Sequence, residues 1–233
     1  MSYLLGSGYH YTKDEHDEFV GIWVKNTVSV NPLPQHILIL TDSNSVPPRP
    51  TQDALAGVRY SVVPLHGNLG KHDLLLTGEK THRFNGWSGC MLALAMIAYT
   101  DEVDFVYKES DCLWYGDVVN EMYRQLGDGG IIFGNCLNPD GSQFQECAQS
   151  LFLVKHAFIP DFVSTYLASP AQNRVDELGE RKFAAMERAN PTMWKRFTFG
   201  YDRGRPINFN DPIFYVQQLT AEELDDFRAR GLV

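Results

Sequence analysis

One run of residues, from His36 to Asp42, constrains the fold more than any other stretch of the chain. Its sequence, His-Ile-Leu-Ile-Leu-Thr-Asp, is apolar without alternation and ends in an acid. Such a run is typical of a strand in a parallel sheet, because helices cover both faces of that kind of sheet. It therefore predicts an α/β fold, with Asp42 at the edge where such sheets bind ligands. A helix-cap or turn role for Asp42, in Asp-Ser-Asn-Ser, is equally open.

The other apolar segments alternate between strand and helix patterns along the chain. Short β-prone runs predict strands at 3–5, 58–65, 105–107, 131–134 and 150–155. Apolar positions at helical spacing predict helices at 14–30, 90–99, 118–126, 159–167 and 177–189. This alternation predicts one α/β domain whose central sheet is mainly parallel and flanked by helices. The last forty residues show little regular pattern until Thr220-Ala-Glu-Glu, a capping box that predicts a short helix.

Composition and charge exclude several classes of protein. The chain is 44% hydrophobic and 21% charged, with a net charge of −9, which argues against a nucleic-acid partner because that affinity comes largely from Lys and Arg. No apolar run reaches the roughly 20 residues of a transmembrane helix, and the N-terminus lacks the basic start of a secretory signal. The four cysteines form no C-x-x-C pair and are expected to be reduced. We therefore expect a cytoplasmic protein, with peripheral contact at a membrane left open.

Two acids, Glu109 and Asp111, directly follow the strand predicted at 105–107. On an extended backbone, side chains two residues apart point the same way. A Mg²⁺ or Mn²⁺ ion could then lie between these carboxylates and a phosphate-bearing ligand. The alternative for so short a motif is a pair of solvated acids in a turn. Their position after an apolar strand at mid-chain favours the metal site.

Three further segments carry groups suited to a phosphate-bearing ligand. The glycines of Gly6-Ser-Gly-Tyr-His allow close approach to the backbone, and Tyr9 could stack on a base; a plain glycine turn is equally open. The stretch 66–85 is locally basic and could offset a diphosphate, or it is a solvated loop. Arg203 and Arg205 could reach phosphate from a C-terminal lid, or they belong to a packed terminal segment.

This order of elements, with an acid pair after the central strand, resembles the nucleotide-sugar glycosyltransferases of the GT-A fold. Their Asp-x-Asp motif follows a strand and binds the metal and the donor's sugar diphosphate; Glu109-Ser110-Asp111 stands in its place here. The resemblance covers most of the chain in element order. It implies one domain, 1–233, with a nucleotide-binding half at 1–116 and an acceptor half with a C-terminal lid at 117–233.

The resemblance also implies an activity and a set of site residues. The activity is transfer of a sugar from a nucleotide-diphosphate-sugar donor to a hydroxyl of a glycan or lipid-linked acceptor, with Mn²⁺ or Mg²⁺ as cofactor at Asp111 and Glu109. The implied donor-binding residues are Ser7, Gly8, Tyr9, Asp42, His82, Arg83 and Asn85, joined by the lid residues Arg203 and Arg205. The implied acceptor-side residues are Gln149 and Ser150, and the implied general base of inverting members is Glu177 or Glu180, with Glu146 and Asp161 as other acids nearby.

The chain departs from the family pattern at two points. Glu109 in place of the first Asp shifts its carboxylate by one methylene, which can leave Asp111 as the only direct ligand. No His follows residue 156, so the C-terminal metal-binding His of some retaining members is absent, and Arg203 and Arg205 could supplement or replace the metal. Two alternatives stay open. One is a sugar-phosphate nucleotidyltransferase, which normally needs a longer basic loop after its first strand, and the other is a non-catalytic binding protein on the same fold.

Overall fold

The computed structural model describes residues 2–9, 14–29, 32–41, 47–65, 86–134, 147–168, 179–200 and 207–233. The strands in these ranges are β1 (Tyr3–Tyr9), β2 (His36–Thr41), β3 (Arg59–Pro64), β4 (Asp104–Lys108), β5 (Cys112–Tyr115), β6 (Ile131–Gly134), β7 (Ala148–Val154), β8 (Trp194–Phe197) and β9 (Phe214–Gln217). The α-helices are α1 (Asp14–Val28), α3 (Gly86–Thr100), α4 (Val118–Leu126), α5 (Ile159–Ala168), α6 (Gly179–Ala189) and α7 (Ala221–Ala229).

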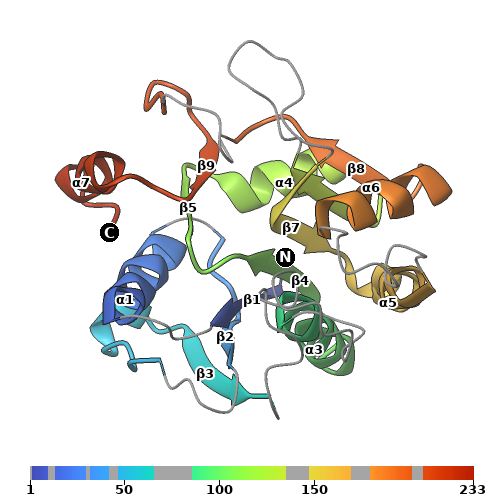
Figure 1. Cartoon of the computed structure of the whole chain (residues 1–233), viewed down its shortest axis with the longest axis horizontal. Coiled ribbons are helices and arrows are strands. Elements are labelled where there is room, and N and C mark those ends of the chain that lie inside the picture. The colour runs from blue at the N-terminus through green and yellow to red at the C-terminus, as the bar shows by residue number, and fades with distance from the viewer. Residues whose placement is uncertain are drawn as a thin grey trace, which may run out of the picture.

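A seven-stranded sheet in the order β3-β2-β1-β4-β7-β6-β8 forms the centre of the molecule (Figure 1). The pairs β1–β2, β2–β3, β1–β4 and β6–β8 are parallel, whereas β7 runs antiparallel to both of its neighbours. The predicted mainly parallel α/β sheet is therefore confirmed. The chain runs outward from β1 to β3 and returns through α3 to β4, on the other side of β1. Such a switch in strand order creates a crevice at the carboxyl ends of the strands.

Helices cover both faces of the sheet, as the apolar run in β2 requires. Trp23 of α1 and Met122 of α4 pack into the core on one face, and Leu94 of α3, Phe162 of α5 and Phe183 of α6 pack into the core on the other. Figure 1 shows α1 and α3 on opposite sides of β1 and β2. All six residues of β2 are buried. None of the helices in the described ranges is long and apolar enough to cross a membrane.

The glycines at the end of β1 let α3 pack closely on the sheet. A Cβ at Gly6 would lie 2.5 Å from the Leu94 side chain, and one at Gly8 would lie 3.2 Å from the sulfur of Cys90. From the sequence, either close approach of a ligand or a plain glycine turn could account for these small residues. The packing of α3 against the sheet is a sufficient reason for a glycine at both Gly6 and Gly8. The side chains of Cys90, Cys112 and Cys147 are buried in the core.

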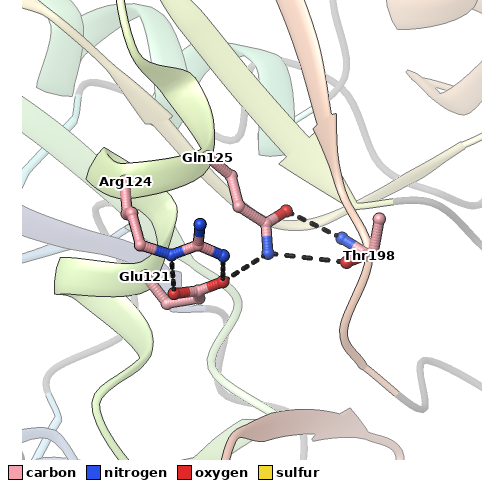
Figure 2. Close-up of polar contacts among 4 residues, drawn as sticks. All are labelled: Glu121, Arg124, Gln125 and Thr198. Carbon is pink, nitrogen blue, oxygen red and sulfur yellow. Dashed lines mark hydrogen bonds and ion pairs between the residues drawn. The ribbon is translucent and has the colours of Figure 1, made fainter.

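Polar contacts join α4 to the segment after β8 (Figure 2). The Gln125 side chain accepts a hydrogen bond from the Thr198 N–H at 3.1 Å and donates to Glu121 at 2.7 Å. Arg124 forms a two-pronged ion pair with the same Glu121 carboxylate. Since Arg124 is exposed, this ion pair adds little stability by itself. The Gln125 bonds fix the helix against the far edge of the sheet.

The C-terminal region forms two strands where the sequence showed little pattern. β8 joins the edge of the main sheet, and β9 pairs antiparallel with β5 in a second, two-stranded sheet. Each of these strands has four residues and pairs with a partner remote in sequence, so no periodic signal marks either one. The capping box at Thr220 and Glu223 is confirmed as the start of α7.

Gly116, just after β5, fixes the approach of the C-terminal segment. Its φ is +76°, and a Cβ there would overlap the carbonyl oxygen of Pro212. Gly57 has a similar φ of +81° with open space around it.

We expect Gly116→Ala to destabilise the protein by more than about 3 kcal/mol, because backbone strain and a steric clash with Pro212 combine. The matched control Gly57→Ala keeps only the strain and should lose roughly 1–2 kcal/mol. Urea unfolding followed by tryptophan fluorescence measures both losses. Equal losses would show that the packing of Pro212 on Gly116 contributes nothing.

Candidate functional site

Glu109, Ser110 and Asp111 form the tight turn that connects β4 to β5. The Cys112 N–H donates to the Glu109 carbonyl at 3.0 Å, which closes a four-residue turn. The assumption of an extended backbone at these acids was therefore wrong. The two carboxylates come together because both contact a side chain of the C-terminal strand β9.

Both carboxylates converge on the side-chain amide of Gln217, the last residue of β9. Its Nε2 donates to Glu109 Oε2 and to Asp111 Oδ1, the latter at 3.4 Å. The neighbouring Gln218 N–H donates to the Asp111 carbonyl at 3.3 Å. The sequence did not predict Gln217 as a site residue, because the strand that carries it pairs with a partner remote in sequence. The β-prone Phe214-Tyr-Val run before it was the available signal.

The backbone of Glu109 is held from two sides. The indole N–H of Trp23, on α1, donates to the Glu109 carbonyl at 2.9 Å. The Glu109 N–H donates to the carbonyl of Ser150, on β7, at 2.8 Å. The acid turn is thus fixed to both neighbouring layers by main-chain hydrogen bonds.

A buried polar network lies directly behind the turn. Lys108 is fully buried, and its Nζ donates to Asn26 Oδ1 at 2.9 Å and to Thr27 Oγ1 at 3.1 Å. The same nitrogen lies 4.8 Å from the ring centroid of Trp23 and 4.2 Å from that of Trp114. Asn26 also exchanges two side-chain-to-backbone hydrogen bonds of 2.9 Å with Trp114. The network therefore joins α1, β4 and β5 in one place.

The two hydrogen-bond acceptors of Lys108 are neutral oxygens. Burial consequently lowers the pKa of Lys108 to about 7, while the nearby Cys112 opposes this shift. Cation–π contact and hydrogen bonds offset only part of the loss of hydration.

We expect the stability of the wild type, relative to Lys108→Met, to rise with pH from about pH 7 to about pH 10 and to be constant below that window. The folded pKa lies below the unfolded one, so the unfolded chain binds more protons in this window. The slope should not exceed about 1.4 kcal/mol per pH unit. Urea unfolding of both proteins across the pH range, without divalent metal, measures the difference. Parallel stability curves would contradict the lowered pKa.

A hollow opens beside the acid turn, at the carboxyl ends of β1 and β2. Its cavity volume is about 10 Å³, which is room for about one water molecule. The residues that line it are Ser7, Gly8, Tyr9, Val20, Trp23, Ile39 and Ser110. The structure thus brings the predicted donor-binding residues of β1 next to the predicted metal-binding turn. This volume is far below that of an ordinary ligand pocket, so the hollow marks a position beside the turn and is not itself a nucleotide-sized cavity.

Gln149 and Ser150 lie on the other side of the turn, at the start of β7. The side-chain oxygens of both residues are buried, and neither has a hydrogen-bond partner among the described residues. Leaving such an oxygen unpaired is costly, so a water, an ion or a ligand would suit this place. Because β4 lies between β1 and β7, the acid turn separates this polar spot from the hollow.

Several predicted site residues lie outside the described part of the chain: Asp42, His82, Arg83, Asn85, Glu146, Glu177, Arg203 and Arg205. Glu180 falls in the first turn of α6, where the side chain is not described. Asp161 is exposed in the first turn of α5. In the described ranges, no group of three or more His, Cys, Asp or Glu residues is placed to hold a metal ion.

Comparison with known proteins assigns this architecture to a fold. No family model matches the chain, and no curated protein matches it in sequence. Among solved structures, an active-site mutant of LgtC matches with a TM-score of 0.56 and 10% identity over 99% of this chain and 96% of that one. Mouse xyloside xylosyltransferase 1 matches with a TM-score of 0.52 and 8% identity over 87% of each chain.

A third match is the glycosyltransferase GlyE of Streptococcus pneumoniae, with a TM-score of 0.50 and 12% identity over 84% of this chain and 44% of that one. Identities this low establish the fold alone. The chain has the fold of the GT-A glycosyltransferases, a mostly parallel central sheet flanked by helices, as the sequence predicted.

Proposed function

We propose that the chain is a glycosyltransferase that moves a sugar from a nucleotide-diphosphate-sugar donor to a hydroxyl of a glycan or lipid-linked acceptor. One observation carries the proposal. The carboxylates of Glu109 and Asp111 converge at the carboxyl edge of the sheet, between the hollow at β1 and the unpaired polar atoms at β7. Fold likeness alone would not carry it, because function resides in the site.

The donor set suits the divalent metal that the fold implies. Carboxylate oxygens are the ligands that Mn²⁺ and Mg²⁺ prefer, and Glu109 and Asp111 supply them in one place. A bound ion would offset the negative charge that develops on the departing diphosphate.

The order of strands supports a separate place for each substrate. The nucleotide binds at the hollow of Ser7, Gly8 and Tyr9, where Trp23 and Ile39 supply an apolar wall. The acceptor hydroxyl binds at Gln149 and Ser150, whose unpaired oxygens gain a partner. The two substrates then meet over the acid turn. This arrangement matches a division into a donor half, 1–116, and an acceptor half, 117–233.

The remaining roles follow the family resemblance. Asp42, His82, Arg83 and Asn85 assist donor binding, and Arg203 and Arg205 contact the diphosphate from the C-terminal segment. Glu180 or Glu177 takes the proton of the acceptor hydroxyl as its oxygen attacks the anomeric carbon. Glu180 begins α6, and the following residues Phe183 and Ala184 anchor that helix in the core.

We expect one family of nucleoside-diphosphate sugars to stabilise the wild type only when Mn²⁺ is present. Binding to the folded state alone adds about 2.7 kcal/mol at a ligand concentration one hundred times Kd. A thermal-shift screen of uridine, guanosine, cytidine, adenosine and thymidine diphosphate sugars measures the effect. Asp111→Asn should abolish it, whereas the exposed control Asp101→Asn should retain it.

Other outcomes of this screen favour metal-independent diphosphate binding, nucleotidyl transfer or a non-catalytic binding protein. Stabilisation that ignores both Mn²⁺ and Asp111→Asn would contradict the metal site and indicate diphosphate binding by arginine. Stabilisation by nucleoside triphosphates, together with release of pyrophosphate from the triphosphate when a sugar phosphate is added, would indicate a nucleotidyltransferase. No response to any nucleotide would favour the non-catalytic binding protein.

Once a donor is known, we expect Glu180→Gln or Glu177→Gln to lower kcat by roughly 10²–10⁴-fold, the usual contribution of a general base. Nucleotide-dependent stabilisation should stay at the wild-type level, because a base acts on the acceptor. Glu222→Gln, at an exposed residue of α7, is the matched control. Wild-type turnover in both of the first two variants would exclude this base assignment.

A further inference from the structure

We propose that Gln217 is the third protein ligand of the divalent-metal site, and that it binds the ion through its amide oxygen. The inference rests on the proposed function and adds to it a residue from the C-terminal strand. Its basis is that one side-chain amide contacts both carboxylates of the acid turn.

The contact itself shows where a cation fits. In the structure, the Gln217 N–H group donates to Glu109 and Asp111, so a partly positive group lies between two negative ones. A metal ion between the same two carboxylates would interact with both of them through the full charge of a cation, once the Gln217 side chain has drawn back to make room. The amide N–H of Gln217 thus offsets part of the repulsion between the two carboxylates.

An amide side chain suits such a site both with and without a bound cation. The nitrogen and oxygen of Gln occupy nearly equivalent positions, and the last side-chain torsion is broad and roughly two-fold. A half-turn about that bond replaces the N–H donor with a carbonyl oxygen without moving the backbone. Two carboxylates attract the N–H group, and a cation held between them attracts the oxygen.

The backbone of Gln217 is held firmly enough to place a ligand. It pairs with Cys112, the residue that follows the acid turn, in the β5–β9 ladder. The Gln218 N–H bonds to the Asp111 carbonyl, and Gly116 and Pro212 fix the other end of the ladder by close contact. Ligands carried on paired strands are positioned more accurately than ligands on free loops.

The resulting ligand set predicts the kind of metal. Two carboxylates and one amide oxygen leave places for phosphate oxygens and water, which is the all-oxygen coordination that Mg²⁺ and Mn²⁺ favour. A third oxygen ligand also compensates for the longer Glu109 side chain in place of Asp.

The test is direct binding of Mn²⁺ alone, measured by the electron paramagnetic resonance of the free ion. We expect Gln217→Leu to weaken Mn²⁺ binding by about 10–100-fold. The exposed glutamine Gln35, at the opposite end of the sheet, gives the matched control Gln35→Leu, which should bind Mn²⁺ as the wild type does. Urea unfolding of each variant verifies that it is folded.

A second variant gives a spectroscopic readout that a purely structural role would not produce. Imidazole is a good metal ligand, so Gln217→His should bind Mn²⁺ with a nitrogen coupling visible in electron spin echo modulation spectra. The wild type, with oxygen ligands only, should lack that imidazole signal. This variant also keeps the test decisive if Gln217→Leu fails to fold.

The possible results separate this inference from the proposed function. Wild-type Mn²⁺ affinity in Gln217→Leu, together with no nitrogen coupling in Gln217→His, would overturn the role of Gln217. If Asp111→Asn still abolished Mn²⁺ binding, the metal-dependent transferase would stand without it. If the wild type bound no Mn²⁺ at all, both this inference and the metal-dependent form of the function would fail.

Discussion

The candidate site depends on the hydrogen bonds between the Asn26 side chain and the backbone of Trp114. They satisfy buried polar groups of β5 that the main sheet does not reach. The same side chain accepts from Lys108, which lies directly before the acid turn. Both ends of the β4–β5 connection are therefore fixed to one residue of α1. Leaving such groups buried without partners would cost several kcal/mol.

Most of the fold could be predicted from the sequence because its signals are local. The apolar run of β2 indicated a sheet covered on both faces, and the capping box at Thr220 marked the start of α7. The mainly parallel sheet followed from the alternation of strands and helices. β8 and β9 could not be predicted in this way, because a four-residue strand depends on a partner far away in the sequence.

The candidate site was predictable only in part, for the same reason. The acid pair and the Ser7–Tyr9 segment follow apolar strands, and this position alone identified them. That they lie together follows from the parallel pairing of β1 with β4. Gln217 was missed because a single amide carries no signal in sequence until β9 is known to pair with β5. The glycines of β1 differ from Gln217, because they were noticed in the sequence. Their packing against Leu94 and Cys90 is what no local pattern reveals.

The pairing of β9 with β5 determines when the candidate site can form during protein synthesis. More than two hundred residues separate Tyr9 at the hollow from Gln217 at the acid turn. Chains emerge from the ribosome N-terminal end first, and contacts between distant residues form late. A nascent chain that has already built β1 to β4 would thus carry the acid turn without its glutamine partner. The candidate site is completed only when the C-terminal strand has been synthesised and has paired with β5.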